Sequence, residues 1–224
     1  MANPDHLDAD IEDINDVLKK IEIAYGIRFG ETELQDVRTF GQLCNCILDK
    51  VSIEDVQDCT TQQAFYKLRD AFVEITGTNR EDIKVNTDLS ELFLSQDRKK
   101  QVKELEAVLG FKTHILTMQP LIKQLTVSVG LLSGIVVFFN WQYGLSGAGL
   151  TIALGLWGFA TANTFTVRTV GELSEKLVME HYINVRRNPL TGNKDEIIRQ
   201  IEKLFLEYLM IDRTGIHPDT IIVS

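Results

Sequence analysis

The sequence predicts an all-α protein that consists of two small helical bundles and one apolar helical hairpin. Two patterns indicate this fold class. Apolar residues recur three and four positions apart over most of the chain, which is the period of an amphipathic helix. Residues 124–167 differ, because these 44 residues contain no charged side chain in a chain that is 25% charged.

Four amphipathic helices are expected before the uncharged run. Glycine, the usual C-terminal cap, follows three of them, and Thr39 can cap the start of the second. The expected ranges are about residues 8–24, 39–50, 61–77 and 96–109, with a loop over 79–93.

The uncharged run can hold two apolar helices joined by a polar, glycine-rich break. We place the arms at about 125–139 and 148–165, and we expect the hairpin, residues 124–165, to insert into a membrane. The alternative is a hairpin buried in a soluble core, because each arm is shorter than the roughly 20 residues that span a bilayer. Two pairs of small residues are spaced for close packing in lipid, namely Gly130 with Gly134 and Gly155 with Gly158.

Charges on the two flanks predict the orientation of the hairpin. Lys112 and Lys123 precede it and Arg168 follows it, whereas the turn has no charge. By the positive-inside rule both chain ends are cytoplasmic, at an inner or plasma membrane. A cytoplasmic protein is the alternative. The first helix contains Asp and Glu, so we expect no N-terminal signal peptide.

Two further helices and a tail are expected after the run. The helices cover about residues 169–180 and 194–209, with a linker of turn residues over 185–194 between them. Residues 215–224 form an extended tail.

Composition limits the partners and the chemistry. The net charge of −9 lies in the first 61 residues. This acidic segment argues against binding to nucleic acid and suits a basic protein partner. The alternative is that it forms a solvated acidic face. Cys44, Cys46 and Cys59 show no disulfide pattern, and the first two are expected to be buried small residues rather than metal ligands. No catalytic, metal-binding or phosphate-binding motif is present, so we expect no enzyme activity.

A basic cluster precedes the hairpin. Its members are Arg98, Lys99, Lys100 and Lys103. They either meet anionic headgroups or form a solvated helix face.

Three pairs of segments indicate an internal repeat. TFGQL at 39–43 matches TVGEL at 169–173, YGIRF at 25–29 resembles LGFKT at 109–113, and 65–87 resembles 201–220. Gly26 and Thr39 are 13 residues apart, whereas Gly110 and Thr169 are 59 apart. The excess nearly equals the uncharged run, so we interpret the hairpin as an insertion into one copy of a repeated helical unit.

The repeat predicts the domain boundaries. The second copy comprises residues 61–120 with 166–180, and the first is split between 1–53 and 194–224. This order is a circular permutation, which requires the chain ends to meet in space. The alternative is a homo-oligomer in which the C-terminal helix completes the bundle of a neighbour.

The repeated unit resembles acyl carrier proteins. LDADIEDINDVLKKIEIAYGIRF at 7–29 is similar to the family's second helix, which starts D-S-L and ends in an acidic LEEEFGI-like stretch. TFGQL and TVGEL are similar to its T-V-G-D-L motif before the last helix, and IHPDTIIVS is similar to the loop before the second helix. The resemblance covers most of the chain outside the hairpin and implies helical bundles that bind acyl-transfer enzymes.

The resemblance also implies where a cofactor would be attached. Family members attach 4′-phosphopantetheine to the serine of D-S-L. Asp10 matches the aspartate, but Ile11 replaces the serine and has no hydroxyl for the phosphodiester. Ser95 is at the corresponding position of the second copy, between Leu94 and Gln96, and is the candidate attachment site. Otherwise Ser95 is a helix N-cap.

The sequence therefore predicts a membrane-anchored, non-catalytic, acyl-carrier-like binding or adaptor protein. Two alternatives stay open. One is a functional carrier loaded with phosphopantetheine on Ser95, and the other is an immunity or antitoxin-type protein that binds a basic partner.

Overall fold

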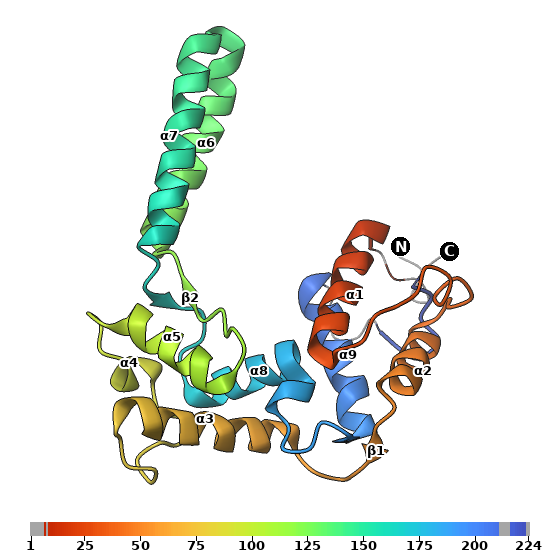
Figure 1. The fold of residues 1–224 in the computed structure, drawn as a ribbon. Coiled ribbons are helices and arrows are strands. Elements are labelled where there is room, and N and C mark those ends of the chain that lie inside the picture. The colour runs from red at the N-terminus through yellow and green to blue at the C-terminus, as the bar shows by residue number, and fades with distance from the viewer. Residues whose placement is uncertain (1–6, 8, 211–215, 223–224) are drawn as a thin grey trace. The chain divides into compact units, whose positions relative to one another are not determined.

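The computed structural model describes residues 7, 9–210 and 216–222, which form nine helices and four two-residue strands. The predicted all-α class is confirmed (Figure 1). The chain divides into two compact units. Unit 1 is Met1–Leu68 together with Ser174–Ser224, and unit 2 is Arg69–Leu173.

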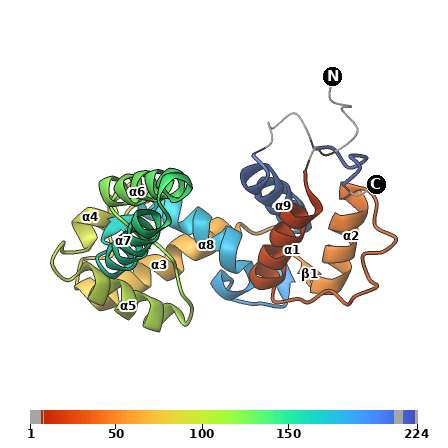
Figure 2. The same cartoon turned by 90° about the horizontal axis from the view of Figure 1, so that it is seen from above.

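Unit 1 is built on α1 (Ile11–Tyr25), α2 (Phe40–Val51) and α9 (Lys194–Tyr208), and α9 packs against both other helices (Figures 1 and 2). The ring of Phe40 meets that of Phe205 edge-on at 5.5 Å between centroids. The expected cap is confirmed, because Thr39 and Gln42 form a complete capping box at the start of α2. The buried apolar side chains of these helices include Val17, Ile21, Leu43, Ile47, Ile201 and Leu204.

The C-terminal segment 216–222 is hydrogen-bonded to the start of α2. The Phe40 N–H donates to Thr220 O at 2.9 Å and the Gly41 N–H donates to Pro218 O at 2.8 Å. The Leu7 N–H donates to Ile221 O at 2.8 Å, so the two ends of the described chain lie side by side. Residues 215, 223 and 224 of the expected tail are outside the described residues.

Unit 2 contains the second half of α3 (Thr60–Thr76), α4 (Leu89–Leu92), α5 (Arg98–Leu109) and the start of α8 (Val170–Val185). Phe93 is its central aromatic residue, 5.4 Å from Phe72 and 5.5 Å from Phe165 between ring centroids. The short helix α4 lies in the segment that we expected to be a loop, and the Asp88 side chain caps it.

The start of α8 is hydrogen-bonded to the segment before α4. The Val170 N–H donates to Thr87 O at 3.0 Å and the Gly171 N–H donates to Val85 O at 2.8 Å. Helix α8 kinks at His181, where φ is −144° and ψ is 42°. This kink is close to the expected end of the helix at residue 180, but the chain resumes a helical path and continues to Val185.

The cysteines of unit 1 differ in exposure, since Cys44 is buried, Cys46 is half-buried and Cys59 is exposed. Burial raises the pKa of the Cys44 thiol to about 12 and also raises the pKa of Cys46. Because the thiolate is the reactive form, we expect Cys59 to react with an aromatic disulfide reagent at pH 8 and Cys44 to react only after unfolding. Reagent titration with and without denaturant, followed by peptide mass mapping, checks this order. Fast labelling of Cys44 in the folded chain would contradict it.

Candidate functional site: an apolar helical hairpin and its base

The uncharged run folds into two antiparallel helices that lie side by side (Figures 1 and 2). Helices α6 (Pro120–Phe139) and α7 (Trp141–Ala160) have 20 residues each, so each is about 30 Å long at 1.5 Å per residue. Their apolar 18-residue windows have mean hydropathies of 1.8 and 1.2 and are only 6% and 11% buried. Two helices long and apolar enough to cross a membrane therefore present their side chains outward.

The expected bounds of the hairpin arms were wrong at the turn. We expect a polar, glycine-rich break between arms at 125–139 and 148–165, but Asn140 alone separates the two helices and α7 begins at Trp141. The Asn140 side chain accepts hydrogen bonds from the N–H groups of Gln142 and Tyr143, which caps α7. The arms are thus longer than predicted, and the objection that they are too short for a bilayer no longer applies.

Several glycines lie within α7 at positions where this helix is in close contact with α6. A Cβ on Gly144 would lie 2.6 Å from the Cα of Val137, and one on Gly147 would lie 2.7 Å from the Oγ of Ser133. The Ser133 hydroxyl donates to Gly144 O at 2.6 Å. Of the predicted glycine pairs, Gly130 and Gly158 face the other helix closely. A Cβ on Gly134 would have no neighbouring atom within 4 Å, and one on Gly155 would reach only Thr126 Cγ2, at 4.0 Å.

Enlarging a contact glycine should separate the two helices. We expect Gly144→Leu to disrupt the pairing, because a side chain there would collide with the backbone of α6. Gly149→Leu is the matched control, since a Cβ at that position would have no neighbouring atom within 4 Å. Disulfide cross-linking of a Gly130→Cys, Thr151→Cys pair reports the pairing, and its yield should fall severalfold only with Gly144→Leu. Equal yields would contradict the interface.

The base of the hairpin is attached to the start of α5 within unit 2. The Lys99 Nζ donates to Ala160 O, the last carbonyl of α7, where a cation suits the helix dipole. The Arg98 guanidinium donates to Asn163 O and lies 4.4 Å from the centre of the Phe165 ring. Strands β2 (Leu116–Thr117) and β3 (Thr164–Phe165) pair antiparallel where the chain enters and leaves the hairpin. Two members of the basic cluster therefore bind backbone at the hairpin base.

Ser95 lies on an exposed turn three residues before α5. Its carbonyl oxygen accepts a hydrogen bond from Asn163 Nδ2 at 3.2 Å. Interpreting Ser95 as a helix N-cap was wrong, because the residue at the N-cap of α5 is Asp97. Ser95 is exposed, but the residue before it is Leu94 instead of the aspartate of a D-S-L motif.

We expect Ser95 to stay unmodified, because the D-S-L motif of the resembled family has an aspartate before its serine, whereas Ser95 follows Leu94. Intact mass after co-expression with a phosphopantetheinyl transferase should equal the mass of the unmodified chain. A gain of one prosthetic arm that disappears in Ser95→Ala would instead establish the carrier alternative.

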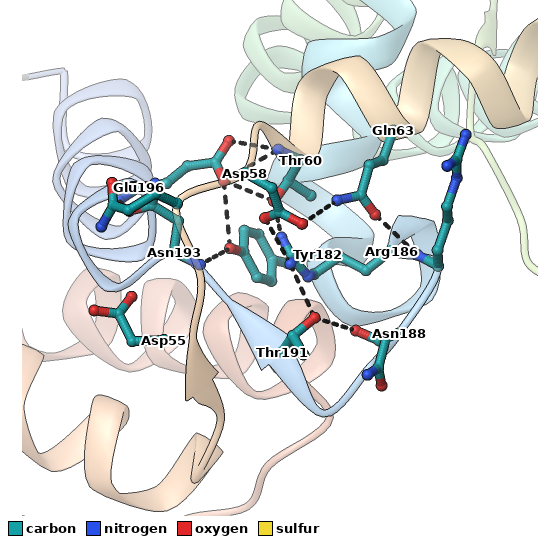
Figure 3. A network of polar contacts seen from close by, with 12 residues as sticks. Asp55, Asp58, Thr60, Gln63, Tyr182, Arg186, Asn188, Thr191, Asn193 and Glu196 are labelled. Atoms are coloured by element: carbon teal, nitrogen blue, oxygen red, sulfur yellow. Dashed lines mark hydrogen bonds and ion pairs between the residues drawn. The ribbon is translucent and has the colours of Figure 1, made fainter.

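A buried polar network in unit 1 was not anticipated from the sequence (Figure 3). The Glu196 carboxylate accepts from the Thr60 N–H at 3.2 Å and from its hydroxyl at 2.6 Å. Arg186 donates to Thr60 Oγ1 and, at 2.7 Å, to Asp58 Oδ1. The Tyr182 hydroxyl donates to Glu196 at 3.4 Å, and burial raises its pKa. These bonds fix the start of α9 to the segment that opens α3.

Next to this network, strands β1 (Glu54–Asp55) and β4 (Thr191–Gly192) pair in parallel. The expected linker over 185–194 therefore contains a strand, with Arg186 buried and bonded to Thr191 Oγ1. Each carboxylate and hydroxyl of the network is engaged within it, so we interpret it as a structural clamp.

Comparison with known proteins gave no match to a family model, to a curated protein or to a solved structure. Within the described residues no group of three or more His, Cys, Asp or Glu is arranged to hold a metal ion. The hairpin and its base are therefore the strongest functional feature that the described chain presents.

Proposed function

We propose that this protein is a membrane-anchored, non-catalytic, acyl-carrier-like binding or adaptor protein. The observation that carries the proposal is the hairpin of two 20-residue apolar helices whose windows are 6% and 11% buried. Apolar patches on soluble monomers seldom exceed a few hundred Å². The exposed apolar side chains of this hairpin need an apolar environment, and the acyl chains of a lipid bilayer would provide one.

The arrangement of side chains along the hairpin supports a full span. Phe138, Phe139, Trp141 and Tyr143 are at its tip and are all exposed, as suits a headgroup layer. The base has Lys99 and Lys123, and the tip has no charge. By the positive-inside rule, we propose that the base and both chain ends are cytoplasmic.

Matching hydrogen bonds support the proposed repeat. In unit 1, Phe40 and Gly41 donate to Thr220 O and Pro218 O, and in unit 2 Val170 and Gly171 donate to Thr87 O and Val85 O. A Cβ on Gly41 or Gly171 would lie 2.9 Å from the same carbonyl oxygen that its N–H contacts. Both TFGQL and TVGEL thus use their glycine for the same close backbone approach.

The ends of α1 and α5 match as well. Both helices stop at a left-handed glycine, Gly26 or Gly110. In each case a glutamate four residues earlier accepts the N–H three residues beyond the glycine. Glu22 accepts from Phe29 at 2.6 Å, and Glu106 accepts from Thr113 at 2.9 Å.

The order of these elements supports permutation and insertion. The second copy has α3, the segment before α4, α5 and then the start of α8, with the hairpin between α5 and α8. Unit 1 has the same order only when its C-terminal α9 and segment 216–222 are placed before α1 and α2. This order of elements is the one that a circular permutation requires.

The first copy supports binding over catalysis. Ile11, at the serine position of the resembled family, is the first residue of α1 and is exposed. Glu12 and Asp13 follow it in the first turn, where acidic residues also suit the helix dipole. An exposed face that combines apolar and acidic side chains suits a partner with a basic, partly apolar surface.

Fractionation of cells that express the full chain tests the membrane anchor. We expect the protein in the membrane pellet and its retention there after alkaline carbonate, which removes peripheral proteins. Recovery of a monodisperse protein from the soluble fraction would overturn the proposal.

A further inference from the structure

We propose that the hairpin base is a docking surface for anionic phospholipid headgroups, formed by Lys99, Lys103 and Lys123. The proposal rests on the membrane-inserted hairpin and specifies the class of lipid around it. The occupant is a phosphate-bearing lipid with net negative charge.

The contacts at the base place two of these lysines at the same end of the hairpin. Lys99 donates to Ala160 O at the end of α7. A Cβ on Gly158 would lie 3.0 Å from Ile122 Cγ2, and Lys123 is the next residue along α6. Lys123 is exposed in the first turn of α6. Its long side chain can extend along the helix to the headgroup level.

Lys103 extends the positive surface along α5. It is exposed and lies four residues after Lys99, which puts it on the same helix face. Arg98 is excluded from the site, because its guanidinium is stacked on the Phe165 ring as well as bound to Asn163 O. The Lys99 ammonium has three N–H donors, so its bond to Ala160 O leaves two for a headgroup phosphate.

Few carboxylates compete for these cations. The sequence has no Asp or Glu between Glu106 and Glu172, so both flanks of the hairpin are purely basic. On α5, Glu104 lies 3.8 Å from Lys100 and Glu106 accepts from the Thr113 N–H at 2.9 Å, whereas the Asp97 carboxylate at the N-cap is two residues from Lys99. The surplus of charge at the lipid-facing end favours anionic headgroups, at roughly a fivefold gain in association per lysine near the surface.

Lipid selectivity of the full chain tests the proposal. The chain is reconstituted in phosphatidylcholine vesicles that contain a trace of spin-labelled phosphatidylglycerol or spin-labelled phosphatidylcholine. The motionally restricted fraction in the electron paramagnetic resonance spectrum gives their relative association. We expect phosphatidylglycerol to associate at least about threefold more strongly, with a preference that weakens in salt.

The triple variant Lys99→Gln, Lys103→Gln, Lys123→Gln should reduce this preference to nearly one. The charge-matched control is Lys19→Gln, Lys20→Gln, Lys194→Gln in unit 1, which should retain it. Sodium phosphate at matched ionic strength should weaken the preference no more than sodium chloride does. A stronger effect of phosphate would identify a free-phosphate site and overturn lipid docking.

Two results separate this inference from the membrane anchor. A restricted fraction of equal size for both lipids would overturn the anionic docking surface and leave the anchor intact. No restricted fraction for either lipid would overturn the anchor itself. Equal losses of preference in the test and control triples would show a general charge effect and would also overturn the site.

Discussion

Arg186→Met is expected to destabilise unit 1 by about 3–5 kcal/mol, the usual cost of removing one partner from a buried ionic network. The Arg186 side chain is fully buried, and methionine has a similar length but no donors. Without the guanidinium, the buried Thr60 hydroxyl that donates to Glu196 loses its own donor, and Asp58 loses its ion-pair partner.

Hydrogen exchange of the full chain in detergent micelles measures this effect. The protection of amides in α9 should fall by roughly a hundredfold to several thousandfold, since each 1.36 kcal/mol is a factor of ten. Arg187→Met is the matched control, because Arg187 is the next residue and is exposed. Arg187→Met should change the opening free energy derived from this protection by less than about 1 kcal/mol. Equal effects of the two variants would contradict the role of the network.

Charged residues in the middle of the hairpin are expected to prevent membrane insertion. Leu131 and Leu150 are near the centres of α6 and α7 and are 67% and 53% exposed. Arginine at the centre of a spanning helix costs about 2.5–3.5 kcal/mol on insertion scales, so the double variant Leu131→Arg, Leu150→Arg should lose roughly 5–7 kcal/mol.

Leu121→Arg is the depth control for this prediction. Leu121 is 78% exposed but lies in the first turn of α6, at the headgroup level of the proposed span. Carbonate-resistant protein should be largely lost in the double variant and retained in the control. If both variants behave alike, the hairpin does not have the depth profile of a membrane span.

Local sequence patterns were sufficient to predict most helices. The ends of α1, α2 and α9 follow from apolar spacing and from residues such as Thr39 and Gly26, whose effects are confined to one helical turn. The exposed hairpin likewise followed from the absence of charge, which is a property of composition.

Features that depend on distant partners could not be predicted in this way. Glycines 144 and 147 suggest a turn when α7 is considered alone, and only their contact with Val137 and Ser133 of α6 explains a helix there. Arg186 and Glu196 are ordinary surface residue types in the sequence. Their burial depends on Thr60, which is more than a hundred residues earlier in the chain.

The proposed span is tested most directly by the accessibility of the hairpin tip from each side of a membrane. The full chain with Tyr143→Cys is prepared in sealed right-side-out vesicles and treated with a membrane-impermeant maleimide. The account predicts labelling of the new thiol at position 143 from outside, whereas the exposed Cys59 is labelled only after the membrane is permeabilised. Protection of both thiols until permeabilisation, or labelling of both from outside, would contradict a hairpin that crosses the bilayer with its base in the cytoplasm.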